Sequence, residues 1–72
     1  MRVFDIEAMV EEMIVQGETV FWFVECEFRG RTFMGSGGSM EDALEEMMSN
    51  MDSFVGDNER VDLKVRRKVT LF

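Results

Sequence analysis

The stretch TVFWFVECEFRGRTF, residues 19–33, alternates its side chains with a period of two and contains a single glycine. One set of alternate residues is apolar and is expected to face a core, namely Val20, Trp22, Val24, Cys26 and Phe28. Arg29 and Gly30 suit a two-residue hairpin turn, after which Phe33 would share a face with Cys26. The pattern therefore predicts an antiparallel hairpin whose second strand covers residues 31–35.

Two phenylalanines lie on the other face of the first of these strands. Phe21 and Phe23 share that face with Glu25 and Glu27 and, from the second strand, with Met34. If a helix covers this face, the two rings belong to the core. If none does, the rings and Met34 form an exposed apolar patch beside charges, which is typical of a protein interface. The sequence leaves both interpretations open.

The N-terminal segment carries apolar residues at helical spacing. They recur at i, i+3, i+4, i+7 and i+8, namely Ile6, Met9, Val10, Met13 and Ile14. Asp5 is placed to cap the start of this segment and Gly17 to end it. The spacing predicts a first amphipathic helix.

A glycine- and serine-rich loop, residues 35–39, precedes a second apolar pattern of helical period. Ser39 and Asp42 fit a capping box at its start, and Gly56 stands where a glycine often follows the end of a helix. The apolar positions in between are Met40, Ala43, Leu44, Met47, Met48, Met51, Phe54 and Val55. We expect a second helix of four turns here.

The last segment alternates again and predicts a third strand. Its apolar residues occupy odd positions, namely Val61, Leu63, Val65, Val69 and Leu71. Arg67 breaks this face, and we expect a bulge or the end of strand pairing there. A right-handed crossover makes this strand parallel to the second, and docking beside the first gives the sheet order 2-1-3. Lys64 and Arg66 would then lie opposite the glutamates of the first strand.

With 72 residues the chain suffices for one small domain, residues 1–72. The elements follow the order α-β-β-α-β, so the sequence predicts the α+β class. We expect a two-layer sandwich in which both helices pack on one face of the three-stranded sheet.

The composition excludes several classes of function. The chain has no histidine, a single cysteine and a net charge of −7, which argues against histidine-ligated metals, histidine-based catalysis and a disulfide scaffold. The apolar stretch near the N-terminus is broken by acidic residues, and no apolar run reaches the roughly 18 residues of a membrane span. We therefore expect a cytoplasmic protein without a membrane partner.

The remaining routes to catalysis or cofactor binding are also weak. Cys26 lies on the predicted buried face without a basic neighbour, and the exposed carboxylates have nothing to desolvate them. The glycine-rich loop lacks the lysine of a phosphate-binding loop, and the methionines follow the core stripe. We predict no enzyme, no cofactor and no metal. Direct nucleic-acid binding is not expected either, because Glu25 and Glu27 separate the aromatic rings from the basic strand.

The charges are sorted along the chain. Residues 1–28 sum to −6, residues 29–31 to +2, residues 32–59 to −7 and residues 60–72 to +4. On the second predicted helix, four carboxylates form two i, i+4 pairs with no basic residue to offset them: Glu41, Asp42, Glu45 and Glu46. They are either an ordinary solvated surface or a face that competes with nucleic-acid phosphates for a basic groove.

Part of the sequence resembles a known family. Phe21, Trp22, Val24 and Glu25, the run SMEDALE at residues 39–45 and the alternating residues 61–66 are similar to the small RNA-polymerase inhibitor of T7-like bacteriophages. The resemblance spans residues 21–68. It implies that an acidic strip and basic side chains of the last strand contact the host enzyme. By position, Lys64 and Arg66 match those basic side chains.

Two shorter segments resemble other families. Residues 38–46 are similar to the glycine-rich turn and helix of HicB-type antitoxins, and residues 35–43 to double-stranded-RNA-binding domains. In the RNA-binding domains basic residues open the helix, whereas Glu41 and Asp42 stand there in this chain.

Together these features predict a non-enzymatic binding protein. We expect a phage-encoded inhibitor that occupies a basic groove of a host protein or nucleoprotein complex, such as RNA polymerase or a CRISPR effector complex. The alternative is an antitoxin or small regulatory domain that binds a protein partner and dimerises. The acidic helix residues carry the first hypothesis, and Phe21, Phe23 and Met34 carry the second.

Overall fold

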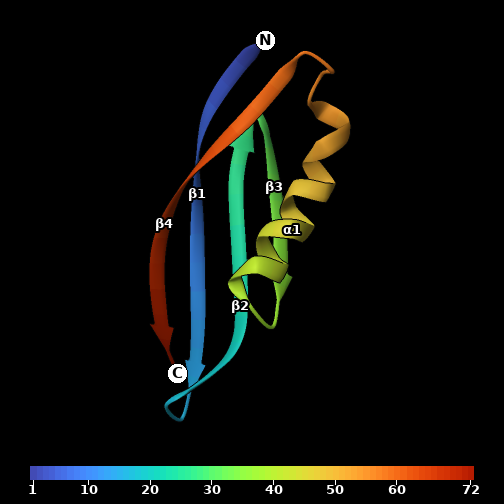
Figure 1. Cartoon of the computed structure of the whole chain (residues 1–72). Coiled ribbons are helices and arrows are strands. Elements are labelled where there is room, and N and C mark those ends of the chain that lie inside the picture. Colours follow the sequence, from blue (N-terminus) through green and yellow to red (C-terminus); the bar gives the residue numbers. More distant parts are fainter.

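Four strands form one mixed sheet in the computed structural model, which describes residues 1–72 (Figure 1). The elements in chain order are β1 (Arg2–Val15), β2 (Glu18–Phe28), β3 (Arg31–Gly37), α1 (Met40–Met51), the 3-10 turn η1 (Asp52–Phe54) and β4 (Glu59–Leu71). The sheet order is β3-β2-β1-β4, and β4 runs parallel to β1 while the other neighbours are antiparallel. Helix α1 packs against β3 and β2, and β4 lies at the far edge of the sheet (Figure 1).

The predicted first helix is wrong, because its residues lie in strand β1. The segment also has a period of two, since Phe4, Ile6, Ala8 and Val10 share the face toward α1, and the last two are fully buried. The physical reason that this segment forms a strand is the turn that follows it. Its two central residues both have positive φ, which gives the tight turn that joins antiparallel strands: Gln16 at 53° and Gly17 at 79°.

The predicted three-stranded sheet with two helices is therefore also wrong. The chain has four strands and one α-helix, and β1 lies between β2 and β4 instead of packing on the sheet. The basic residues of β4 consequently face β1 and not β2. Arg66 Nε lies 3.3 Å from Glu7 Oε1, so the expected pairing with the glutamates of β2 is wrong.

The predicted hairpin of β2 and β3 is confirmed. Arg29 and Gly30 form its turn with φ of 55° and 76°, and Cys26 pairs with Phe33 across the two strands. The irregularity of the sheet lies elsewhere than predicted. The β1–β4 register is continuous through Arg67, whereas the β1–β2 register shifts between Met13 and Ile14.

Helix α1 begins as the sequence predicts and ends earlier. Ser39 Oγ accepts a hydrogen bond from the backbone N–H of Asp42 at 3.1 Å, which confirms Ser39 as the N-cap. The α-helix stops at Met51, and a 3-10 turn continues the chain to Phe54.

The core lies between α1 and the sheet. It comprises nine buried residues: Ala8, Val10, Val24, Cys26, Phe28, Phe33, Ala43, Met47 and Met51. Because α1 covers β2 and β3, the apolar side chains that the C-terminal part of β4 turns to the same side stay exposed. Val65, Val69 and Leu71 have exposed fractions of 42%, 55% and 74%. The opposite side of the sheet, here called the open face, is covered by no element.

Candidate functional site

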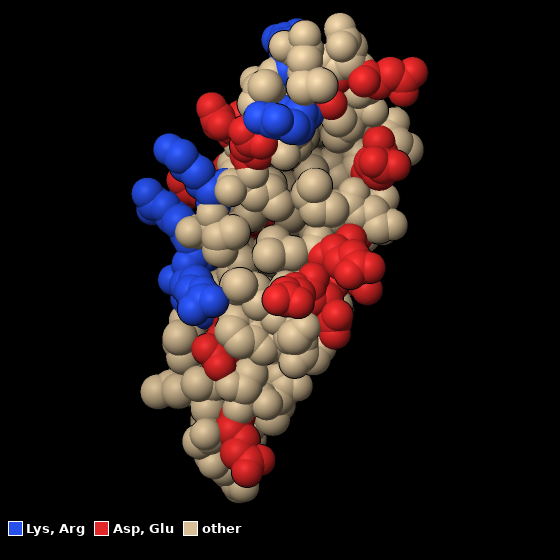
Figure 2. Space-filling model, viewed as in Figure 1, with Lys and Arg blue, Asp and Glu red and all other residues tan.

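The outer side of α1 carries the four carboxylates singled out from the sequence. All four side chains are exposed, and we call this set the acidic helix face: Glu41, Asp42, Glu45 and Glu46. None of them lies within ion-pair distance of a basic side chain, because all four ion pairs of the molecule involve other acids. Figure 2 shows acidic atoms over α1 and basic atoms along the opposite, β4 side of the same view.

The four carboxylates differ in their structural roles. Glu46 accepts a hydrogen bond from the backbone N–H of Ser36 at 3.2 Å and so ties α1 to β3. Glu41 and Asp42 occupy the first turn, where the helix dipole favours negative charge. Glu45 has neither a hydrogen bond nor the dipole to stabilise it, and it follows Glu41 at i+4, where like charges repel. Glu45 is thus the carboxylate of this face with the least evident role in stabilising the fold.

Phe21 and Phe23 of β2 lie on the open face, so no helix covers them. Phe21 and Met34 are 37% and 49% exposed, and Phe23 is half-buried. Two methionines of β1 extend the patch, since Met13 pairs with Phe21 and Met9 pairs with the neighbouring Glu25. We call this set the open-face patch: Met9, Met13, Phe21, Phe23 and Met34.

Sequence reasoning missed the two methionines of this patch. It assigned them to the core stripe of a helix, whereas the period of two in residues 4–10 places odd-numbered residues of β1 opposite the buried ones. Reading the segment with that period would have placed Met9 and Met13 beside the phenylalanines.

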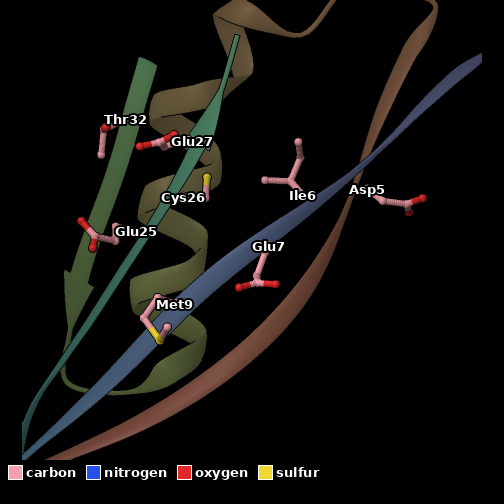
Figure 3. A pocket seen from close by; sticks show the side chains of 8 residues that line it. All are labelled: Asp5, Ile6, Glu7, Met9, Glu25, Cys26, Glu27 and Thr32. Atoms are coloured by element: carbon pink, nitrogen blue, oxygen red, sulfur yellow. The ribbon is translucent and has the colours of Figure 1, made fainter. Parts of the chain in front are cut away.

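A hollow of about 460 Å³ lies on the open face between β1 and β2, and four of its lining residues are acidic. Figure 3 shows that Glu7 and Met9 come from β1 and that Glu25 and Glu27 come from β2. Asp5 and Thr32 complete the polar lining. The acidic side chains do not form a group of three in a geometry that could hold a metal ion. The sequence did not predict that acids of β1 and β2 line one hollow, because the segment with Asp5 and Glu7 was expected to be a helix.

The basic residues of β4 divide between the two faces of the sheet. Lys64 and Arg66 lie on the open face, where Arg66 pairs with Glu7 and Lys64 has no acidic partner within ion-pair distance. Arg67 points to the other face, where its Nη2 lies 3.4 Å from the sulfur of Met40. On the open face Arg66 is the register partner of Met9, so Lys64 and Arg66 border the open-face patch. The acidic helix face lies apart on α1, and the structure therefore does not bring all the predicted site residues into one cluster.

The side chains of Cys26 and Glu59 have pKa values shifted from the ordinary ones. Burial raises the pKa of the Cys26 thiol, whose sulfur lies 3.9 Å from that of Met51 in the core, so the thiol is not poised as a nucleophile. The pKa of Glu59 is lowered, chiefly because the backbone N–H of Gly56 donates to its carboxylate at 2.7 Å. Arg29 also pairs with Glu59 and so joins the β2–β3 turn to the start of β4.

No helix in the chain combines the length and the apolar composition that a bilayer crossing requires. Comparison of the chain with models of protein families, with characterised proteins and with solved structures finds no match.

Proposed function

We propose that this protein is a non-enzymatic inhibitor that places the acidic helix face in a basic groove of a larger protein or nucleoprotein complex. The observation that carries the proposal is that α1 holds four exposed carboxylates close together and none of them has a basic partner. Elsewhere in the chain Glu7, Glu11, Glu59 and Asp62 each pair with a basic side chain. The kind of partner is a cytoplasmic machine that handles nucleic acid, such as RNA polymerase or a CRISPR effector complex, in the host of a phage that encodes the chain.

Energetics favour this use of α1. Like charges at i, i+4 on one helix cost a few tenths of a kcal/mol per pair, and a basic partner would relieve that repulsion. Residues four apart on a helix are separated by about 6 Å along its axis, which is comparable to the separation of neighbouring phosphates along a nucleic-acid backbone. The face therefore offers a basic groove a spacing of negative charge like that of its usual ligand.

Neutralisation of the acidic helix face tests the proposal. The variant with Glu41→Gln, Asp42→Asn and Glu45→Gln removes three charges while it keeps shape and leaves Glu46 bonded to β3. The tagged protein is used to capture partners from bacterial lysate, and mass spectrometry identifies them. We expect a nucleic-acid-handling complex that the wild type captures at low salt, that high salt releases and that the variant does not capture.

The matched control removes three charges elsewhere. Glu18→Gln, Asp57→Asn and Asp52→Asn change exposed acids that form no ion pair and lie outside the acidic helix face. Capture that survives neutralisation of α1, or that both variants lose equally, contradicts the proposal.

The open-face patch favours a second candidate, an antitoxin or small regulatory domain that dimerises. A set of partly exposed apolar side chains flanked by carboxylates is typical of a protein interface. Under this hypothesis partner binding depends on Phe21, Phe23 and Met34 and is insensitive to the charges of α1. The two candidates are therefore separated by the same capture experiment.

A further inference from the structure

The two edge strands of the sheet, β3 and β4, differ in whether other parts of the chain bond to their outward backbone groups. At the β3 edge, α1 supplies partners for the outward backbone groups. Glu46 accepts from the N–H of Ser36 at 3.2 Å, and the side-chain amide of Asn50 donates to the carbonyl of Met34 at 2.9 Å. These contacts occupy two of the outward groups that another strand would need, so α1 partly blocks strand addition at the β3 edge.

The β4 edge has no such protection. Its bonds to β1 begin and end with Arg2 N–H to Asn58 O and Phe72 N–H to Ile14 O, both at 2.9 Å, and the register between them is continuous. Both of these bonds use an even-numbered residue at the β4 end, Asn58 or Phe72. Bonding residues alternate along a strand of a parallel sheet, so the even-numbered residues of β4 are the ones that bond to β1. The backbone N–H and C=O groups of the odd-numbered residues therefore point away from the sheet, and no side chain of the molecule bonds to them. They belong to Val61, Leu63, Val65, Arg67, Val69 and Leu71.

The side chains of β4 define what could pair with this edge. On the open face four of its residues are basic, and we call them the basic row: Arg60, Lys64, Arg66 and Lys68. The one acid of β4, Asp62, lies among them and pairs with Arg60. On the other face Val65 and Val69 are about half exposed, because α1 does not reach them. A complementary strand would carry acids on one face and apolar residues on the other.

Strand β1 already shows this complement on the inner side of β4. It sets Glu7 and Glu11 beside Arg66 and Lys68 on the open face, at 3.3 and 4.0 Å. On the other face it sets Ala8 opposite Val65. The pattern that β4 accepts on its inner edge is thus an alternation of acidic and apolar residues.

We propose that the outer edge of β4 binds an extended segment of a partner protein, with alternating acidic and apolar residues, as a fifth strand of the sheet. Main-chain hydrogen bonds to the odd-numbered residues supply affinity, and the basic row supplies selectivity. This surface lies across the sheet from the acidic helix face, and the inference does not depend on the proposed function.

A second copy of the chain does not fit this edge. Residues 60–72 carry five basic residues and one acidic residue, a net +4, so antiparallel pairing of two β4 strands would oppose basic side chains. The other sheet edge of a second copy is β3, which contains no acidic residue to match the basic side chains of β4 and is partly blocked by its own α1. The charges that disfavour pairing of two β4 edges are the same ones that favour an acidic strand there.

Hydrogen exchange of the backbone amides of the full chain, followed by NMR, tests the proposal. The probe is a synthetic peptide with the sequence of residues 3–12, VFDIEAMVEE, and the control peptide has lysine in place of its four acids. At a peptide concentration ten times the Kd, exchange at Leu63, Val65, Arg67 and Val69 should slow by about tenfold, while even-numbered residues of β4 keep their rates. The lysine peptide should give no protection.

A pair of variants shows whether the backbone edge is responsible. Val65→Pro removes an outward N–H, which an edge strand tolerates, whereas Val65→Ala keeps it. We expect the peptide to protect the alanine variant and not the proline variant, with exchange in β2 unchanged in both as evidence of folding.

Three results would overturn the proposal. They are protection at β3 instead of β4, equal protection by the lysine peptide, and no change in exchange at millimolar acidic peptide. A single-stranded oligothymidylate added in place of the peptide forms a further arm. If the oligonucleotide protects the edge and the acidic peptide does not, the basic row is a nucleic-acid site and the peptide proposal is wrong.

Discussion

Gly35 of β3 lies so close to Ala43 of α1 that a Cβ atom at residue 35 would stand 2.2 Å from the Ala43 carbonyl oxygen. The next nearest atom, the backbone nitrogen of Met47, would be 2.5 Å away. Both are main-chain atoms, which cannot move aside as a flexible side chain can. The absence of a side chain at Gly35 therefore sets how closely α1 approaches the sheet.

Gly35→Ala should destabilise the protein by about 1–3 kcal/mol or more, because the helix must shift away from β3 and loosen the core. Urea denaturation followed by circular dichroism measures the loss. Gly38→Ala is the matched control, since nothing lies within 4 Å of the added carbon and its φ is not positive. Equal stabilities of the two variants would show that the helix does not sit this close.

The position of β1 between β2 and β4 predicts which charges interact. A double-mutant cycle on Glu7→Gln and Arg66→Gln should give a coupling of about 0.2–1 kcal/mol, because both side chains are largely exposed and solvent screens the pair. The same cycle on Glu25→Gln and Arg66→Gln should give a smaller coupling, since β1 separates those residues. A larger coupling to Glu25 would contradict the sheet order.

Glu59 should make stability depend on pH in the acid range. Its pKa is lowered below the ordinary value of 4.5, so folding favours the ionised form. That contribution is complete above the unfolded-state pKa and is lost as the pH falls through the lower folded-state value. Denaturation of wild type and Glu59→Gln between pH 3 and 7 should show a wild-type advantage at neutral pH that shrinks toward pH 3. An advantage that grows on acidification would contradict the shift.

The open-face patch should matter for association more than for folding. Phe21→Ser with Met34→Ser removes exposed apolar side chains, so we expect a loss of stability of at most about 1 kcal/mol. Met47→Ala, in the core, should cost about 2–5 kcal/mol. If the protein dimerises through the patch, analytical ultracentrifugation should show a dimer for the wild type and a monomer for the double serine variant. A dimer that the double variant retains would exclude the patch as its interface.

Cys26 should be protected from thiol reagents in the folded protein. It is 5% exposed, and burial raises its pKa, so the reactive thiolate is scarce and shielded. A chromogenic disulfide reagent at pH 8 should react slowly with the native chain and quickly in denaturant. Rapid reaction of the native protein would indicate that the core around Met51 opens readily.

The second hairpin and the start of the helix could be predicted because their signals are local. Arg29 and Gly30 suit a turn that only a few residues determine, and Ser39 caps α1 through a bond to a residue three positions away. The same holds for the buried position of Cys26, which follows from alternation within one strand.

The N-terminal segment could not be assigned in this way, because residues 2–15 satisfy two periods at once. Met9 and Met13 fit a helical stripe together with Val10, and Val10 also fits a strand together with Ala8. What decides between them is pairing with a strand on each side: β2, joined by the turn at Gln16 and Gly17, and β4, which lies near the other end of the chain.

By itself, the sequence determined the alternation of β2 and β4, the turn between β2 and β3, the N-cap of α1, and the separation of acidic from basic segments. Tertiary structure alone decided that β1 enters the sheet, that the open-face patch is uncovered and that Glu7 meets Arg66. The physical reason is that these outcomes depend on hydrogen bonds and burial between residues up to about sixty positions apart, which no local pattern encodes.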